Sequence, residues 1–219
     1  KNVVEPYAGS FAVIRDVYSD KKYKKYVNDL DPELWYIYNH INELIEAYKI
    51  WNEIEKKQIT VKEKKSEIEN NNKINPLIKN YIIKNMIIRG SITNNKNCNV
   101  DDDYLKLLNE INFTNEDAFE TIEKHRKNKN TFIFLDPPYL FSNNSGYNPQ
   151  NSKDDNDMTD WYLKYLDILN DKTTKAKIML VINDLKILRR IFDKYYKRDY
   201  DKIYQIGKKK AKHLIITNY

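Results

Sequence analysis

The sequence predicts an α/β protein with a mainly parallel sheet, a C-terminal antiparallel hairpin and a helical insertion. Short runs rich in β-branched and aromatic residues alternate with longer segments of helical periodicity, a pattern typical of a sheet whose strands are joined by helices. The last two runs are separated only by a turn around Gly207, which favours a hairpin. At 219 residues, the chain is long enough for one domain with a sizeable core and a small insertion.

The expected strands are the short apolar or β-branched runs at residues 2–4, 22–28, 110–114, 131–135, 177–182, 201–206 and 213–217. The expected helices include the segments between them at residues 32–57, 116–126, 157–169 and 184–196. The helix at 32–57 has a well-marked start, because Asp31 can cap a helix N-terminus and Pro32 suits the first helical position.

Residues 51–109 separate the second and third expected strands and are far longer than a usual crossover. They contain a charge-rich segment at 56–69 and an apolar helix at 76–88. We expect a catalytic part formed by residues 1–50 and 110–219, with 51–109 as a helical insertion. From its length and composition alone, the insertion is a surface decoration or a partner-binding element.

The segment Asp136-Pro137-Pro138-Tyr139 follows the expected strand at 131–135. Two consecutive prolines cannot continue a sheet ladder, so the strand ends there. Asp136 is thereby placed at a carboxyl end, where open α/β sheets bind ligands. The Asp136 carboxylate and the Pro137 carbonyl could accept both N–H groups of an adenine amino group, while Tyr139 stacks on the base with a free energy of roughly 1–3 kcal/mol. The alternative is an Asx-Pro turn that closes a strand above a core tyrosine.

A second binding loop is indicated near the N-terminus. Val3 and Val4 form a short strand, a helix is expected from about Phe11, and between them lies the loop Glu5-Pro6-Tyr7-Ala8-Gly9-Ser10. Such a loop presents backbone N–H groups to a ligand, and Gly9 allows close approach. Asp29 ends the second expected strand roughly 20 residues later, where nucleotide-binding folds hold a ribose.

With these segments, the chain resembles the Dam-like DNA adenine methyltransferases, which use S-adenosylmethionine (SAM). The matching pieces, in the family's order, are Val4-Glu5-Pro6-Tyr7-Ala8-Gly9-Ser10, Asn28-Asp29-Leu30-Asp31-Pro32-Glu33-Leu34, Asn115-Glu116-Asp117-Ala118-Phe119, Asp136-Pro137-Pro138-Tyr139 and Leu214-Ile215-Ile216-Thr217-Asn218-Tyr219. They span nearly the whole chain, and the first and fourth are the most specific. The resemblance implies a Rossmann-like SAM-dependent methyltransferase sheet. In the family, the position of residues 51–109 holds the target recognition domain, so we expect the helical insertion to be that domain.

The resemblance also implies roles for these residues. The loop from Glu5 to Phe11 would bind SAM together with Asp29 and Leu30. Asp117 and Ala118 would hold the adenine of SAM. The segment from Asp136 to Tyr139 would hold the target adenine, with Asp136 bordering the cofactor as well. The family usually has a second glycine where this chain has Phe11, whose bulk would crowd the cofactor.

Charge and composition add weaker indications. The net charge is +6 with a pI near 9.0, although an AT-rich genome alone could produce so many lysines, asparagines, isoleucines and tyrosines. Lysines cluster at 124–129 and 194–213, either as solvated turns and strand edges or as phosphate contacts in a groove beside the pocket. We expect the nucleic acid to be contacted by Tyr139, Asn85, Arg89, Lys208, Lys209 and Lys210. The match of Asn85 and Arg89-Gly90 to the family is a loose one.

Other features exclude classes of protein. A single cysteine, Cys98, allows no intramolecular disulfide, and three scattered histidines offer no metal-ligand spacing. No apolar run has membrane length and no signal-peptide pattern occurs, so we expect a soluble, cytoplasmic protein of bacterial, phage or viral origin.

The sequence therefore predicts a site-specific enzyme that transfers a methyl group from SAM to the exocyclic amino group of adenine in DNA, without a metal. RNA methylation and a non-catalytic, nucleic-acid-binding subunit with its pocket blocked by Phe11 stay open as alternatives. The family also carries a preceding Gly-Gly-Lys pattern beside the SAM methionine, which this sequence lacks. We expect a missing N-terminal segment or a partner protein to complete the pocket, unless the polar segment 140–157, a candidate lid, substitutes for it.

Overall fold

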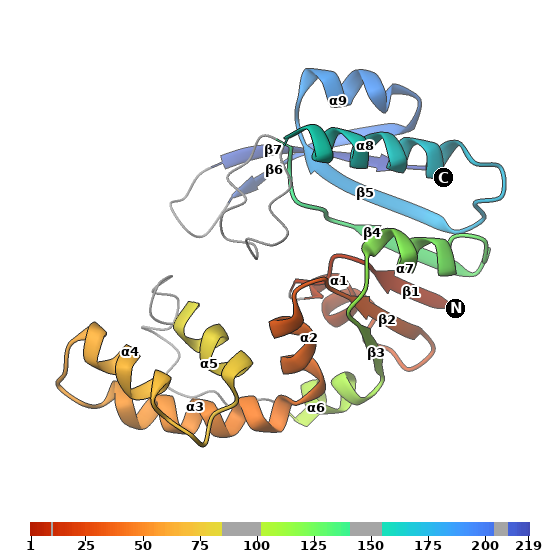
Figure 1. Ribbon diagram of the computed structural model, residues 1–219. Coiled ribbons are helices and arrows are strands. Elements are labelled where there is room, and N and C mark those ends of the chain that lie inside the picture. Colours follow the sequence, from red (N-terminus) through yellow and green to blue (C-terminus); the bar gives the residue numbers. More distant parts are fainter. Residues whose placement is uncertain (10, 85–101, 141–154, 204–209) are drawn as a thin grey trace. The chain divides into compact units, whose positions relative to one another are not determined.

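The structure, a computed structural model, describes residues 1–9, 11–84, 102–140, 155–203 and 210–219 (Figure 1). Its contacts divide the chain into two compact units. Unit 1 comprises Lys1–Leu30 and Thr114–Tyr219, and unit 2 comprises Asp31–Phe113. Unit 2 therefore begins 20 residues before the insertion expected at 51–109.

The described residues form a seven-stranded sheet with the order β3-β2-β1-β4-β5-β7-β6. The strands are β1 (Asn2–Glu5), β2 (Lys24–Asn28), β3 (Ile111–Thr114), β4 (Thr131–Leu135), β5 (Lys177–Asn183), β6 (Tyr196–Ile203) and β7 (Lys210–Thr217). β1 pairs in parallel with β2 and β4, and β4 pairs in parallel with β5. β7 lies antiparallel between β5 and β6. The predicted mainly parallel sheet with a C-terminal antiparallel hairpin is confirmed.

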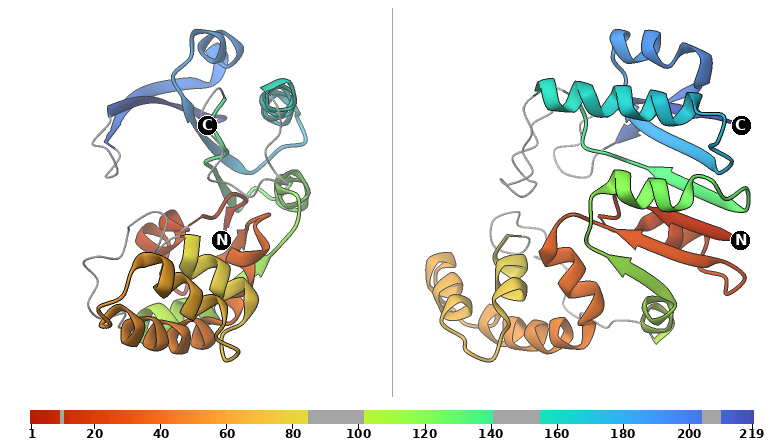
Figure 2. Two further views of the ribbon diagram at one scale, coloured as in Figure 1. Left: turned by 60° about the vertical axis from the view of Figure 1, so that its left-hand side comes forward. Right: turned by 45° about the vertical axis from the view of Figure 1, so that its right-hand side comes forward.

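Helices cover both faces of this sheet. They are α1 (Ala12–Val17), α7 (Ala118–His125), α8 (Asp155–Asn170) and α9 (Lys186–Ile191). Figure 2 shows α7 and α8 on one face and α1 on the other. β4 explains the division, because its side chains alternate between the faces. Ile133 and Leu135 enter the core formed with α7, α8 and α9, whereas Phe132 packs against Tyr18, which follows α1, at 5.6 Å between ring centroids.

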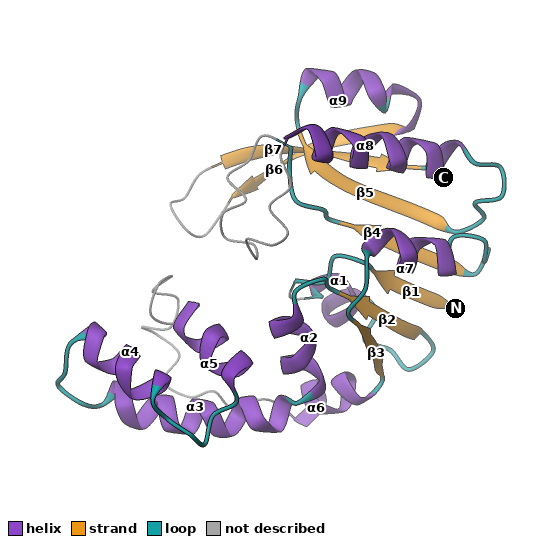
Figure 3. Cartoon of the chain, viewed as in Figure 1, coloured by secondary structure: helices purple, strands orange, loops and turns teal. Residues whose placement is uncertain are grey.

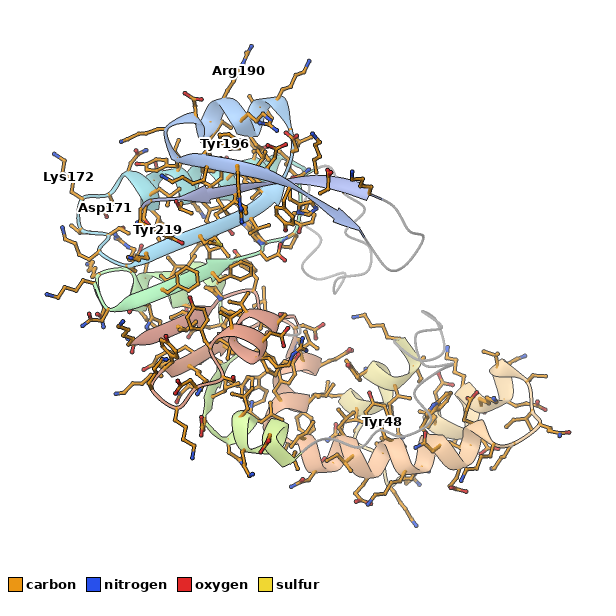
Figure 4. All side chains as sticks on the ribbon, turned by 180° about the vertical axis from the view of Figure 1, so that it is seen from behind. Tyr48, Asp171, Lys172, Arg190, Tyr196 and Tyr219 are labelled. Atoms are coloured by element: carbon orange, nitrogen blue, oxygen red, sulfur yellow. The ribbon has the colours of Figure 1, made fainter. Side chains whose placement is uncertain are left out.

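The carboxyl ends of β1, β2, β4 and β5 lie at one edge of the sheet, and a polar clamp closes the opposite edge. Arg126, only 9% exposed, donates to Asp171 at 2.6 Å and to Thr173 and Thr174 at 3.0 Å each. This clamp joins the α7–β4 turn to the α8–β5 turn, and Figure 4 shows Asp171 in the latter.

Two lysines of the predicted 124–129 cluster are placed by the same arrangement. Lys127 and Lys129 precede β4, whereas Asp136 follows it, so the five residues of the strand, roughly 17 Å, separate them. The expectation that this cluster borders the pocket is wrong for these two lysines. The predicted strand at 131–135 already implied this, because residues just before a strand lie at the opposite end of it from the motif that follows it.

Unit 2 is built mainly of helices around its own core. They are α2 (Pro32–Asn39), α3 (Ile41–Glu55), α4 (Val61–Glu69), α5 (Pro76–Ile82) and α6 (Asp102–Asn109). Asp31 caps α2 by accepting the N–H of Glu33 at 2.8 Å, with Pro32 at the first position, as predicted. Trp51, Ile68 and Ile78 are among its buried residues.

The predicted helix at 32–57 is interrupted at His40, whose backbone leaves the helical region with φ −129° and ψ 44°. The His40 ring stacks on Tyr36 at 4.0 Å, and its Nδ1 lies 2.9 Å from the Tyr36 carbonyl oxygen. This local side-chain-to-backbone contact competes with the helix and ends α2. Neither Gly nor Pro marks the break in the sequence.

The C-terminal helix and strand also differ from expectation (Figure 3). α9 ends at Ile191 instead of continuing to residue 196, and β6 begins at Tyr196 instead of 201. Phe192 and Tyr195 face the core around a short 3₁₀ turn, which redirects the chain into β6. The end of the expected strand, 204–206, lies outside the described residues.

Candidate active site at the carboxyl edge of the sheet

Asn28, the last residue of β2, connects three segments at the carboxyl edge. It is 1% exposed. Its Nδ2 donates to the carbonyl oxygens of Pro6 at 3.1 Å and Glu116 at 3.0 Å, while its Oδ1 accepts from the Glu116 N–H at 3.0 Å and the Thr114 hydroxyl at 2.8 Å. Both amide hydrogens and both lone pairs are thus engaged. We did not select Asn28 from the sequence; a buried amide beside an acidic strand end is the signal that could have indicated it.

Asp29 closes the loop that follows β1. Its Oδ2 accepts the N–H of Gly9 at 2.9 Å, and the Ala8 N–H donates to the Asn28 carbonyl at 2.9 Å. Gly9 has φ +47°, a conformation that favours glycine, and no atom of the described residues other than Gly9 and its chain neighbours lies within 4 Å of the position a Cβ would take there. The loop therefore offers open space beside a held carboxylate, which suits a ligand with hydroxyl groups.

Asp117 begins α7 near this loop, since Asn28 bonds to the preceding Glu116. The Asp117 carboxylate caps the helix by accepting the Phe119 N–H at 2.8 Å. Ala118 is 6% exposed, whereas Leu30, beyond Asp29, is 41% exposed. Ser10 lies outside the described residues. The expected cofactor-binding residues that the structure describes thus come mostly from one edge of unit 1.

Glu5 ends β1 and points inward, because it is 2% exposed. Its carboxylate accepts the backbone N–H of Ile14 at the start of α1. Burial raises the pKa of Glu5 to about 7, although the N–H groups of Ile14 and Val13 act in the opposite direction; the charge of Asp136 raises it further. Glu5 therefore anchors α1 from the interior.

Phe11 has a left-handed backbone, with φ 38° and ψ 44°, and is the only described residue other than glycine with positive φ. A bulky residue in this region is a conformational outlier that costs of order 1–3 kcal/mol. Its ring is fully buried, and its N–H donates to the Ala8 carbonyl at 2.6 Å. The position thus has the backbone that glycine favours, and the bulk of the ring is taken up by the interior.

An aromatic cluster lies between the first loop and the helices α7 and α8. The hydroxyl groups of Tyr7 and Tyr165 are hydrogen-bonded, and Tyr7 contacts Trp161 at 6.2 Å between ring centroids. Phe119 stacks on Tyr165 at 5.0 Å and meets Trp161 edge-on at 6.0 Å. Burial raises the pKa of Tyr7 and of Tyr165, so both phenols keep their protons near neutral pH. Of these residues, only Tyr7 was expected at the site.

Residues 136–140, which follow β4, are held in two ways. Side chains of other elements bond to the backbone of this segment, and two of its own side chains bond to each other. The Tyr139 hydroxyl donates to Asp136 Oδ1 at 2.7 Å. Tyr162 on α8 donates to the Pro138 carbonyl at 3.2 Å and accepts the Leu140 N–H at 3.3 Å. Asn183, at the end of β5, donates to the Leu140 carbonyl at 2.8 Å. Pro137 is buried, whereas Asp136 and Tyr139 are half-buried, so the carboxylate and the ring are presented at the edge.

The expected nucleic-acid contacts are less completely described. Asn85, Arg89, Lys208 and Lys209 lie outside the described residues. Lys210 begins β7 and forms an ion pair with Asp201 at 2.6 Å, and Lys212 lies 3.5 Å from Asp199. Part of the positive charge on this hairpin is therefore offset by aspartates of β6.

Two features are absent from the residues that the structure describes. No group of three or more His, Cys, Asp or Glu side chains among them is arranged to hold a metal ion. None of their helices is both long and apolar enough to cross a bilayer.

Comparison with known proteins gives one result for nearly the whole chain. A family model described as D12 class N6 adenine-specific DNA methyltransferase matches residues 1–211. No curated protein sequence matches the chain.

Proposed function

We propose, since the chain belongs to the D12 class of N6 adenine-specific DNA methyltransferases, that it transfers a methyl group from SAM to the exocyclic amino group of adenine at specific DNA sites. Methylation of adenine in DNA is the activity that the family implies. The cofactor, the residue roles and the site specificity are the proposal. Its main support is the position of Asp136 and Tyr139 at the carboxyl end of β4, the edge where Asp29 and Gly9 also lie.

The first loop suits the cofactor on physical grounds. Open space beside Gly9 lets a ligand approach the backbone, and the Gly9 N–H holds the Asp29 carboxylate in a fixed position. A fixed carboxylate can accept the two hydroxyls of a ribose. When bound, SAM supplies an electrophilic methyl group on a positively charged sulfur. We assign Asp29 to the ribose and Asp117 to the adenine of SAM.

Asp136 and Tyr139 are assigned to the target base. The Tyr139 hydroxyl donates to Asp136 Oδ1, and an adenine amino group is a donor of the same kind. The hydrogen bond of the phenol shows that Asp136 Oδ1 is accessible as an acceptor, and an amino N–H of the target adenine could bind to the same atom. The base must leave the duplex, at a cost of a few kcal/mol, before its amino group reaches this carboxylate. Accepting one amino hydrogen on Asp136 and another on the Pro137 carbonyl makes the nitrogen lone pair available, and alignment with the methyl group supplies most of the catalysis.

The test is methyl transfer from radiolabelled SAM to duplex DNA or to RNA, followed by identification of the modified nucleoside. We expect N6-methyladenine in DNA from the wild type. Asp136→Ala should abolish transfer while leaving SAM affinity largely intact, because this carboxylate acts on the target amine. Asp160→Ala, an exposed aspartate on α8, is the matched control and should retain activity. Near-normal turnover by Asp136→Ala would place the reaction elsewhere.

Target recognition is assigned to the helical unit and the lysine-rich hairpin. Arg89 and Asn85 would read the sequence, and Lys208, Lys209 and Lys210 would contact phosphates. The support for this division is the position of the insertion between the cofactor loop and the segment from Asp136 to Tyr139, as in the resembled family. The ion pair of Lys210 with Asp201 must be broken or shared when Lys210 contacts a phosphate.

A further inference from the structure

His213 lies in the second strand of the C-terminal hairpin, which is flanked by β5 and β6 in the sheet, and is 1% exposed. It belongs to β7, opposite Asn183 of β5 on one side and Tyr200 of β6 on the other. The Tyr200 ring contacts it at 5.5 Å between centroids. Burying an imidazole costs more free energy than burying an apolar side chain of similar size, so this position calls for a reason beyond filling the core. In the sequence His213 only ended a basic stretch.

The imidazole packs against the aromatic ring of the proposed target site. The Tyr139 and His213 rings lie 4.8 Å apart between centroids at an interplanar angle of 83°, an edge-to-face contact. Tyr139 is held at its far end by the 2.7 Å hydrogen bond to Asp136 Oδ1. The ring is therefore fixed at two points, one on β7 and one on its own segment.

The backbone beside Tyr139 is fixed from the same strand pair. Asn183, the register partner of His213, donates to the carbonyl of Leu140, the residue after Tyr139. The buried Oδ1 of Asn183 has no hydrogen-bond partner among the described residues. The only hydrogen bond of the Asn183 side chain among the described residues is therefore the one to the Leu140 carbonyl. Asn183 holds the backbone beside Tyr139, and His213 packs against the Tyr139 ring.

We propose that His213 is a positioning residue for Tyr139, setting the orientation in which that ring stacks on the target base. The inference rests on the proposed function, because it assigns a role in capturing the adenine. A ring held in advance need not be ordered when the base arrives, so the contact acts on base capture and methyl transfer. It does not act on SAM, which is assigned to other residues at the edge.

A double-mutant cycle tests the inference. His213→Ala, Tyr139→Ala and the double variant are compared for kcat and KM with a duplex substrate, with SAM affinity measured in parallel. His213→Ala should lower kcat/KM by roughly 2–10-fold, the range of an edge-to-face pair, and should leave SAM affinity unchanged. In the Tyr139→Ala background the same change should have almost no further effect, since its partner ring is gone. His213→Phe keeps an aromatic edge and should recover part of the loss.

Phe192→Leu is the control, because Phe192 is a fully buried ring in the core of unit 1 and makes no ring contact with Tyr139 among the described residues. Its effect should be the same in both backgrounds. If His213→Ala fails to fold, His213→Gln enters the cycle in its place. If the wild type is active but His213→Ala lowers kcat/KM equally with and without the Tyr139 ring, the role of His213 is overturned and the proposed function stands. A wild type that methylates no adenine would overturn the proposed function, and this role with it.

Discussion

Replacing Glu5 by glutamine should stabilise the protein near pH 8 and change its stability little near pH 5. Glu5 is 2% exposed and accepts the Ile14 N–H at the start of α1. Removal from water is the largest cause that raises its pKa to about 7, and the negative charge of Asp136 adds to it. Glutamine has the same shape and can accept the same N–H without carrying a charge.

The sign of the pH dependence follows from where the proton is bound. Between pH 4.5 and about 7, the folded protein keeps a proton on Glu5 that the unfolded chain releases, so the free energy of unfolding falls as pH rises through this window. Above about pH 7 both states are ionised and the loss is complete. The shift from 4.5 to about 7 corresponds to about 3 kcal/mol. The Glu5→Gln variant lacks this loss.

Urea unfolding of both proteins across this pH range measures the difference. The free energy of unfolding of the wild type should fall as pH rises from 4.5 to about 7, whereas that of Glu5→Gln should change less. Asp171→Asn is the control, because the N–H and hydroxyl of Thr173, and after them Arg126, lower the pKa of Asp171 to about 2. Its stabilising contribution is present above pH 3.8 and lost as pH falls through about 2, so it adds no slope near neutrality. Parallel curves for wild type and Glu5→Gln would refute the reasoning.

Three further predictions concern ligands. Asp29→Ala should weaken SAM binding by roughly 1.5–3 kcal/mol, because it removes a charged acceptor and releases the Gly9 N–H; calorimetry showing unchanged affinity would contradict the assignment. Tyr139→Phe should retain more methyl transfer than Tyr139→Ala, since the stacking ring is kept although the donor to Asp136 is lost; equal losses in steady-state kinetics would argue against stacking. DNA affinity should fall with salt with a log–log slope of about −0.9 per phosphate contact. In anisotropy measurements, replacing Arg89 should alter sequence preference, whereas replacing Lys208 to Lys210 should weaken all sequences alike; the reverse pattern would exchange their roles.

Some boundaries of strands and helices could be predicted because several residues restrict the backbone directly. Pro137 and Pro138 cannot continue a strand, and Asp31 with Pro32 starts a helix, whatever surrounds them. The break at His40 could not be predicted in this way. It depends on a ring and a carbonyl one helical turn apart, in a segment whose residues all tolerate a helix.

The site shows the same limit. Asp29 and Asp136 could be expected at an edge because each follows a predicted strand, whereas Asp117 was expected from the resemblance alone. Asn28 and His213 act through strand register, which sets their neighbours: Pro6 and Glu116 for the former, Asn183 and Tyr139 for the latter. A pairing of residues far apart in sequence is absent from any local pattern.

Phe11 shows how a departure from a family pattern is explained by the backbone. The resemblance placed a glycine at this position, and the sequence alone suggested that a bulky ring there would obstruct the cofactor. The observed φ of 38° shows what the turn requires, a left-handed residue between the Ala8 carbonyl and the first turn of α1. Glycine meets that requirement without strain, whereas Phe11 meets it with strain while burying an entire aromatic ring. Burying a ring of this size stabilises by about 1.5–3 kcal/mol, similar to the cost of the strain, so the same turn can be kept with either residue.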